Sequence, residues 1–350
     1  MRSSNRWEEV DTDANSGISV GEVEPGRLLP GLVEAAPGAE VCSFAAKHRS
    51  AIRSALLEYG ALLFRGFGVT EASQFEDFTR AVDLPLMDYP RGMSPRTCLR
   101  GRIFSSTDTR PDFPIPLHTE MSYAPIYPQG IVFGCSTPAG EGGQTPVVDL
   151  RRVLARIPEF AVAELENRGL QYIQIVPMQP TPILTQTWPH MFGTRHHSEV
   201  ERIAAEQGNE CSWLEDGSLR LLARMPAFRR HPKTGERVWF NQAPVWCGSM
   251  SEELAEFASS GGEPLDAAGG KEDSGLGASK ALDCCYGDGA ALPFDLMDGV
   301  RRSVRELSVS FPWQRGDLLL IDNLRVGHGR TTYTGERLIL AALVSELWLH

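Results

Sequence analysis

The chain has 350 residues, of which 42% are hydrophobic and 23% charged, and this ordinary globular composition excludes a disordered chain or a coiled coil. Thirty-four basic residues against 45 acidic ones give a net charge of −11, which argues against a protein held on a nucleic-acid backbone. The sequence contains no uninterrupted apolar run of about 18 residues, so no membrane-spanning helix is expected.

The first part of the chain predicts a helix–strand–helix opening. Residues 1–40 carry scattered Gly, Pro and acidic residues and predict a loosely structured lead-in. Apolar side chains with helical spacing predict helices over 43–59 and 70–82. Between them, a short apolar run at 61–64 follows a glycine and predicts a buried strand.

The middle of the chain predicts several short strands. Short apolar runs separated by Pro and Gly are typical of an antiparallel sandwich or jelly roll. Helices are expected over 150–167 and from Ser198, where Ser198-Glu-Val-Glu201 has the spacing of a capping box. The predicted strands cover 130–135, 145–148, 172–176 and 237–240.

The C-terminal part resumes the β pattern after an unusual stretch. Residues 259–280 are rich in Gly, Ser, Ala and charge, and they predict a mobile insertion rather than a linker. A helix is expected over 296–307, followed by strands over 317–322 and 337–344. We therefore expect one β-rich α+β domain over residues 1–350, with flanking helices and insertions; two domains are the less favoured alternative.

The cysteines and the N-terminus bear on the cellular compartment. Seven cysteines, an odd number, occur without CxxC spacing, which argues against a disulfide framework or a structural zinc site. The polar first residues contain no apolar stretch typical of a secretory signal. A reducing, cytoplasmic location is expected.

One short segment, Pro116-Leu-His118-Thr-Glu120, carries a metal-binding pattern. If His118 and Glu120 lie on one strand, their side chains point to the same face. They then form two-thirds of the 2-His-1-carboxylate triad, which binds Fe(II) and leaves coordination positions open. This pattern is weak by itself, because a surface histidine beside a solvated glutamate is the more common arrangement.

A second segment near the C-terminus strengthens the hypothesis. The predicted strand at 317–322 leads into a polar turn and His328, and Arg337 lies on the next strand. An arginine can bind a carboxylate through two charge-assisted hydrogen bonds, as a site for a dicarboxylate cosubstrate requires. Each residue alone is compatible with a structural role, but together and in this order they favour a binding site.

With these residues in place, the sequence resembles the Fe(II)/2-oxoglutarate-dependent dioxygenases of the taurine dioxygenase (TauD/TfdA) superfamily. The likeness extends from about Tyr59 to the C-terminus. The segments HTEMSY, GGQTPVVDL, HPKTGERVWFNQ and DNLRVGHGRTTYTGERLIL are most similar to the SyrP-like and clavaminate-synthase-like branch. The resemblance implies a double-stranded β-helix core (jelly roll, cupin-like) and oxidation of an amino acid or amino-acid-derived intermediate in natural-product biosynthesis.

The resemblance also implies roles for individual residues. The six that match functional positions are His118, Glu120 and His328 as iron ligands, with Arg337, Thr145 and, ranked lower, Arg330 as the residues that bind 2-oxoglutarate. The segment Trp239-Phe-Asn241 borders the pocket in relatives, so its residues are candidates for the lining. The implied cofactor is Fe(II), and the cosubstrates are 2-oxoglutarate and O2.

The implied reaction decarboxylates 2-oxoglutarate to succinate and CO2 and hydroxylates an unactivated C–H bond. Ala341 stands where taurine-type enzymes have a sulfonate-binding arginine, which argues against a sulfonate substrate. Glu120 stands where related halogenases have Ala or Gly, which favours oxidation over chlorination.

Several alternatives stay open. The same chemistry can end in desaturation, cyclisation or epimerisation, and the amino-acid-like substrate can be free or tethered to a carrier protein. An alternative of another class is a metal-free β-helix binding protein. Neither nucleic acid nor membrane is expected as a partner, and the oligomeric state is left open.

Overall fold

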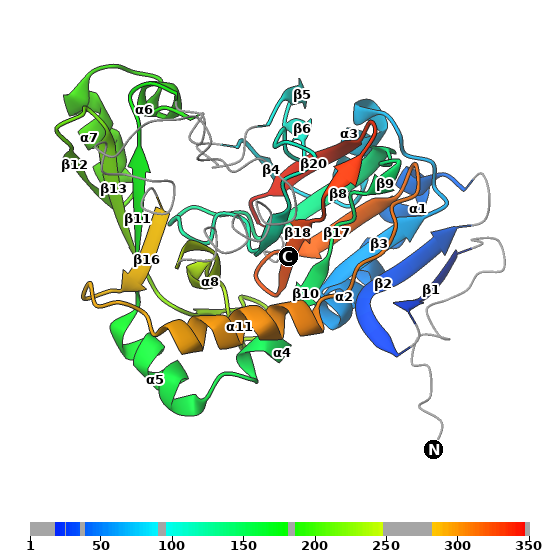
Figure 1. Ribbon diagram of the computed structural model, residues 1–350. Helices are drawn as coiled ribbons and strands as arrows, with labels where there is room; N and C mark the ends of the chain where they lie inside the picture. Colours follow the sequence, from blue (N-terminus) through cyan, green and yellow to red (C-terminus); the bar gives the residue numbers. More distant parts are fainter. Residues whose placement is uncertain are drawn as a thin grey trace.

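The computed structural model describes residues 18–24, 26–35, 39–89, 96–180, 186–247 and 282–346. Over these residues the chain has the expected β-rich α+β fold, with a large sheet, a small sheet packed on it, and a third sheet to one side (Figure 1). The insertion expected at 259–280 lies outside the described residues. None of the described helices is long and apolar enough to cross a membrane.

The large sheet has the strand order β1-β2-β3-β17-β8-β20-β6-β5, with β4 paired to β20. Only the β2–β3 pair is parallel among the pairs described. Its strands are β1 (Ile18–Glu24), β2 (Arg27–Ala35), β3 (Ala61–Arg65), β4 (Leu86–Met87), β5 (Cys98–Arg100), β6 (Ile103–Ser105), β8 (Gly130–Thr137), β17 (Leu318–Asp322) and β20 (Leu338–Val344). The predicted strands at 61–64, 130–135, 317–322 and 337–344 are therefore confirmed as central members.

The central strands are mostly apolar on both faces, as expected for a sheet that is covered on both sides. All five residues of β17 are buried. On one face pack α1 (Val41–Lys47), α2 (Arg49–Tyr59) and α3 (Ala72–Ala81), whose apolar sides form one core with the sheet. The helix expected over 43–59 is divided at His48, which leaves the helical conformation.

The other face of the large sheet carries the small sheet, of order β10-β18-β7. Its strands are β10 (Val147–Asp149), β18 (Val326–Arg330) and β7 (Ile115–His118). A second core lies between the two sheets and includes Leu63, Phe133, Val326 and Ile339. The strand β7 ends at His118, so the condition that Glu120 shares that strand is not met: Glu120 lies in the turn that follows.

The third sheet, of order β12-β13-β11-β16, lies apart from the other two (Figure 1). Its strands are β11 (Leu170–Val176), β12 (Asn209–Trp213), β13 (Leu219–Met225) and β16 (Leu282–Tyr286). The strand predicted at 172–176 is present, but it belongs to this sheet rather than to the expected sandwich. A run such as Tyr172-Ile-Gln-Ile contains no signal for the sheet it joins.

Helices of the middle and C-terminal regions pack on this third sheet and beside the small one. They are α4 (Leu150–Leu154), α5 (Glu159–Arg168), α6 (Trp188–Phe192), α7 (His197–Glu206), α8 (Ala243–Trp246) and α11 (Phe294–Leu307). Two short hairpin pairs complete the fold: β9 (Glu141–Gly142) with β19 (Tyr333–Thr334), and β14 (Arg229–Arg230) with β15 (Arg237–Val238). The capping box expected at Ser198 is wrong, because α7 begins at His197 and its N-cap is His196.

The expected loose lead-in is also wrong over residues 18–24 and 27–35, which form β1 and β2. The strand β2 joins the large sheet beside β3, and its Leu29 and Val33 are buried in the two different cores. Pro30 and Gly31 interrupt the apolar run in this strand, so the sequence pattern did not predict it.

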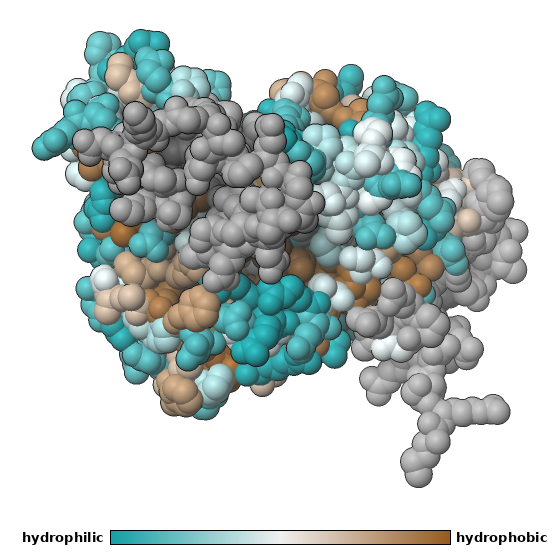
Figure 2. Space-filling view, viewed as in Figure 1, coloured by the Kyte–Doolittle hydropathy of each residue, from teal (hydrophilic) through white to brown (hydrophobic). Residues whose placement is uncertain are grey.

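The surface is largely hydrophilic in one view, and the cysteines are unpaired. Figure 2 shows hydrophilic residues over much of the face in view, interrupted by smaller apolar areas. All seven cysteines are free thiols.

The contact between α3 and the large sheet gives a test of the fold. The Phe75 ring is fully buried and lies directly over Gly134 of β8, where an added Cβ would come within 2.6 Å of the ring. We expect Phe75→Ala to lower the free energy of unfolding by about 3–5 kcal/mol, because it leaves a cavity in the core. Phe160, which is 76% exposed, provides the matched control, and Phe160→Ala should change little. Urea unfolding measures both, and equal losses would contradict this packing.

Candidate metal centre

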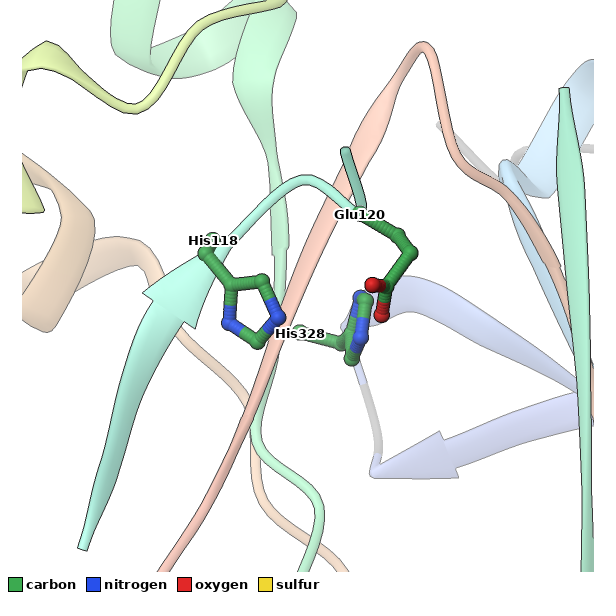
Figure 3. Close-up of side chains that lie close together, drawn as sticks. All are labelled: His118, Glu120 and His328. Carbon is green, nitrogen blue, oxygen red and sulfur yellow. The ribbon is translucent and has the colours of Figure 1, made fainter. Parts of the chain in front are cut away.

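Two histidines from distant parts of the chain are direct neighbours on adjacent strands. His118 on β7 is paired with His328 on β18, and the centroids of their rings are 4.5 Å apart. Paired residues on antiparallel strands present their side chains side by side on one face. Glu120 reaches the same place from the turn after β7, and Figure 3 shows the two rings and the carboxylate gathered together. The three potential ligand atoms all lie within 4.8 Å of one another, as a 2-His-1-carboxylate metal site requires.

The turn that carries Glu120 is fixed by a buried amide. Asn323, in the turn between β17 and β18, accepts a hydrogen bond from the Glu120 backbone N–H (2.8 Å) and donates to the Glu120 carbonyl (3.0 Å). Its amide also donates to the carbonyl of Pro128 (2.7 Å). From the other side, Gln242 donates to the carbonyl of Thr119. The carboxylate ligand is therefore positioned by the chain even though it is not on a strand.

Both histidines are suited to metal binding as neutral rings. His118 Nδ1 lies 2.8 Å from the carbonyl of Pro116, and since a carbonyl can only accept, Nδ1 carries the hydrogen; in a neutral ring this leaves the lone pair on Nε2. Burial, followed by the neighbouring His118 and Arg96, holds the pKa of His328 well below its usual value. His328 Nδ1 is buried without a hydrogen-bond partner in the described part of the chain. Neutral imidazole is the form that coordinates a metal ion.

Glu120 shares its carboxylate with an arginine. Arg96 Nη2 donates to Glu120 Oε2 at 2.7 Å, and the two side chains are 4% and 7% exposed. Burial alone would lower the pKa of Arg96, but the charge of Glu120, its hydrogen bond and the nearby Tyr89 and Tyr123 together outweigh burial, so the pKa is raised. One carboxylate oxygen is thus held by a charged partner, and Oε1 is left for the metal.

A cavity beside the triad contains the other residues singled out from the sequence. Its lining includes His118, His328, Thr145, Arg330 and Arg337. Arg337 Nε donates to the carbonyl of Gly143 (3.0 Å), and burial together with Arg330 lowers the pKa of Arg337 to about 10, which leaves it charged at neutral pH. The Thr145 hydroxyl accepts from Trp313 Nε1 at 3.0 Å, so its own proton can be donated.

Arg330 differs from Arg337 in its contacts. Its two Nη groups donate to the backbone carbonyls of Thr109, Arg110 and Phe113. These bonds tie the loop before β7 to β18. Arg330 therefore lines the cavity mainly as a residue that holds its wall.

A steric constraint explains why position 143 of the GGQT segment is a glycine. Gly143 has a φ of 66°, which favours glycine, and an added Cβ would lie 3.0 Å from both Cδ and Nε of Arg337. A side chain here would displace the arginine. The local sequence therefore creates the space that Arg337 occupies.

The aromatic segment expected at the pocket does not reach the cavity that contains both histidines. Trp239 and Asn241 line a neighbouring cavity, which His118 also lines. Asn241 bonds the backbone of Ala227 and Ala243, and Phe240 packs in a small core with Leu324.

Sequence reasoning missed three residues of this region. Arg96 follows an Arg-, Gly- and Pro-containing stretch with no pattern that distinguishes it. Trp313 lies in an aromatic segment that carries no sequence signal for its bond to Thr145. Asn323 was part of a recognised segment, and its position in a polar turn after a buried strand was the one signal for its role.

Comparisons with known proteins agree with this geometry. Residues 26–343 match the family described as taurine catabolism dioxygenase TauD, TfdA family. A clavaminate synthase-like protein of Arabidopsis thaliana is 34% identical over 297 residues, 83% of each chain. The dapdiamide synthesis protein DdaC of Enterobacter agglomerans is 30% identical over 296 residues, 84% of each chain.

Solved structures with the same fold are more distant in sequence. PvcB from Pseudomonas aeruginosa has a TM-score of 0.51 at 14% identity, covering 94% of this chain and 92% of that one. AAD-2, solved with Mn(II) and N-oxalylglycine, has a TM-score of 0.53 at 13% identity, covering 94% of this chain and 96% of that one.

The Asn323 bonds lead to a prediction about metal affinity. We expect Asn323→Ala to weaken Mn(II) binding by about 10- to 100-fold, because the turn that presents Glu120 loses its support. Calorimetric titration of the apo-protein measures the change. Asn209→Ala, in β12 of the third sheet, serves as the control and should bind like the wild type. Unchanged affinity in Asn323→Ala would mean that the turn holds its shape without the amide.

Proposed function

The chain belongs to the TauD/TfdA family of Fe(II)- and 2-oxoglutarate-dependent dioxygenases, and from this premise we propose that it hydroxylates an unactivated C–H bond of an amino acid or amino-acid-derived intermediate. The family resemblance found in the sequence is confirmed. The observation that carries the proposal is the convergence of His118, Glu120 and His328 beside a cavity with buried arginines.

We assign Fe(II) to this triad. His118 offers Nε2, Glu120 offers Oε1, and His328 offers a neutral ring, so the donor set is the one that suits non-haem iron. When bound, the iron together with 2-oxoglutarate and O2 supplies the oxidising chemistry, with release of succinate and CO2. Arg96 keeps hold of Glu120 Oε2 and so favours coordination through a single carboxylate oxygen.

We assign the distal carboxylate of 2-oxoglutarate to Arg337 and Thr145. Arg337 contributes the charge, and its bond to Gly143 fixes where the guanidinium lies. Thr145 contributes a short, directional donor, since Trp313 already donates to its oxygen. Arg330, which is engaged with three backbone carbonyls, contributes to the shape and positive potential of the cavity.

The cavity wall keeps water away from the reacting atoms. Ile115, Phe133 and Ile339 contribute apolar surface beside the two histidines, and the Phe133 ring lies 5.3 Å from that of His328. Exclusion of water strengthens the charge interactions within the site and would limit side reactions.

The substrate class is supported by the relatives and by one departure from the family pattern. A dapdiamide synthesis protein and a clavaminate synthase-like protein are the relatives at 30% identity or more reported above. Ala341 is fully buried in the core between the sheets, so this position provides no cation for a sulfonate. Glu120 occupies the position that a halide would need, which favours hydroxylation over chlorination; a carrier-tethered substrate is the variant of this proposal.

The same premise supports a single domain over residues 1–350 with a jelly-roll, double-stranded β-helix core. The pairing of a large and a small antiparallel sheet around one buried core is consistent with that architecture. The third sheet is then an insertion into it.

The metal assignment predicts a spectroscopic result. Anaerobic addition of Fe(II) and 2-oxoglutarate to the apo-protein should produce the weak visible charge-transfer band of the chelate. His118→Ala and His328→Ala should each remove the band and turnover, because each removes one of three ligands. A folded wild-type protein with a flat spectrum would contradict the assignment and favour a non-catalytic binding protein.

The cosubstrate assignment predicts a selective defect. Arg337→Ala should raise the 2-oxoglutarate concentration needed for half-maximal activity by about 10- to 100-fold, because a charge-assisted bond is lost, while Mn(II) affinity stays close to that of the wild type. Arg330→Ala is the comparison and should mainly lower the thermal midpoint. A larger cosubstrate defect in Arg330→Ala than in Arg337→Ala would reverse the two roles.

A further inference from the structure

Arg96 is a buried cation that the functions assigned so far do not fully use. It lies just before β5 and lines the same cavity as His118, His328 and Arg337. Its side chain is 4% exposed, and its contact with Glu120 places it on the carboxylate side of the triad. Any molecule bound next to the metal on this side meets its guanidinium.

The guanidinium keeps a pair of donors available. Nη2 donates to Glu120, whereas Nε and Nη1 are buried without a hydrogen-bond partner in the described part of the chain. A guanidinium has two forked edges, Nε with Nη2 and Nη1 with Nη2, and Nη2 carries two hydrogens. Whichever hydrogen binds Glu120, one edge remains complete. A complete edge is the geometry that binds a carboxylate through two parallel bonds.

The position of this fork is fixed before any ligand arrives. The Tyr89 ring packs against the guanidinium with its centroid 4.3 Å from Cζ, and Glu120 holds Nη2. Restraint at two points reduces the conformational entropy that the side chain would lose on binding a ligand. Arg330 shows the contrasting case, since both of its Nη groups are engaged with backbone carbonyls.

The charged residues that line the cavity favour the binding of an anion. Its described lining contains Arg96, Arg330 and Arg337 and no acidic residue, and Glu120 is the acidic ligand beside it. The two negative charges of 2-oxoglutarate offset the two positive charges of Fe(II). The positive charges of the three arginines therefore still exceed the single negative charge of Glu120. A buried surplus of positive charge is costly unless a partner neutralises it. Arg337 and Thr145 are assigned to the cosubstrate, which leaves Arg96 for the substrate.

We propose that Arg96 binds a free carboxylate of the substrate and so selects acids over their neutral derivatives. The inference rests on the proposed function and deepens it: the substrate class is an amino acid or amino-acid-derived acid with an ionised carboxylate next to the metal. A compound whose only carboxyl group is an amide or a thioester lacks the group that Arg96 binds. Arg96 thus supplies the substrate-binding cation that position 341 lacks.

The test compares acids with their amides. Wild-type protein saturated with Mn(II) and 2-oxoglutarate is titrated calorimetrically with the proteinogenic L-amino acids and with the primary amide of each. We expect at least one acid to bind at least about tenfold more tightly than its amide. Arg96→Gln should weaken binding of that acid by about 10- to 100-fold and leave binding of the amide nearly unchanged. Arg96→Lys keeps the charge but not the forked donor pair, so its affinity for the acid should lie between those of the wild type and Arg96→Gln.

Arg100→Gln is the matched control, because Arg100 is an exposed arginine of β5 paired with Glu76, and it should behave like the wild type. Equal binding of acids and amides, or binding of no acid to the loaded wild type, overturns the inference. The inference is also overturned if Arg96→Gln binds Mn(II) more weakly but, once saturated with Mn(II), binds the acid normally. That result would mean that Arg96 only positions Glu120. The Fe(II) chelate band is read before any amino acid is added, so failure of the proposed function is recognised separately.

Discussion

The pair of hydrogen bonds between the Asn323 side chain and the Glu120 backbone is the constraint on which the centre depends. It joins the turn after β7 to the turn before β18, two segments 203 residues apart. Cross-strand pairing of His118 with His328 brings two ligands together, but Glu120 lies beyond the end of its strand and needs this separate support. The sheet and the buried amide together produce a ligand set that neither could produce alone.

The buried arginines near the metal site have different roles. Each buried guanidinium near the metal has a different set of partners: a carboxylate ligand for Arg96, a glycine carbonyl for Arg337, and a row of loop carbonyls for Arg330. Because an arginine stays charged even when burial lowers its pKa, all of them contribute positive potential. Their free donors, rather than their charge, distinguish the residue that shapes the wall from those that can bind a ligand.

Much of this could be predicted from the sequence, for physical reasons specific to each element. Strands such as β17 and β20 are apolar on both faces, and α3 shows clear helical spacing, so their type and place were evident. The six site residues stand in short segments whose chemistry is unusual enough to recognise. The structure brings His118, Glu120 and His328 together and places Thr145, Arg330 and Arg337 along the adjoining cavity.

The remainder depended on contacts that no local pattern encodes. The sequence could not assign β11 to the third sheet, because strand pairing is decided by partners far along the chain. Arg96 acquires its importance only from the carboxylate and the ring that the fold places beside it. The strand β2 was missed because Pro30 and Gly31 interrupt its apolar pattern.

The long separation in sequence between the metal ligands has a consequence for the synthesis of the protein on the ribosome. A growing chain that has not yet reached β18 possesses His118 and Glu120 but lacks His328 and the Asn323 amide that fixes the turn. On the ribosome such a nascent chain offers iron an incomplete and unsupported pair of ligands. The complete ligand set therefore does not exist until β18 has been synthesised.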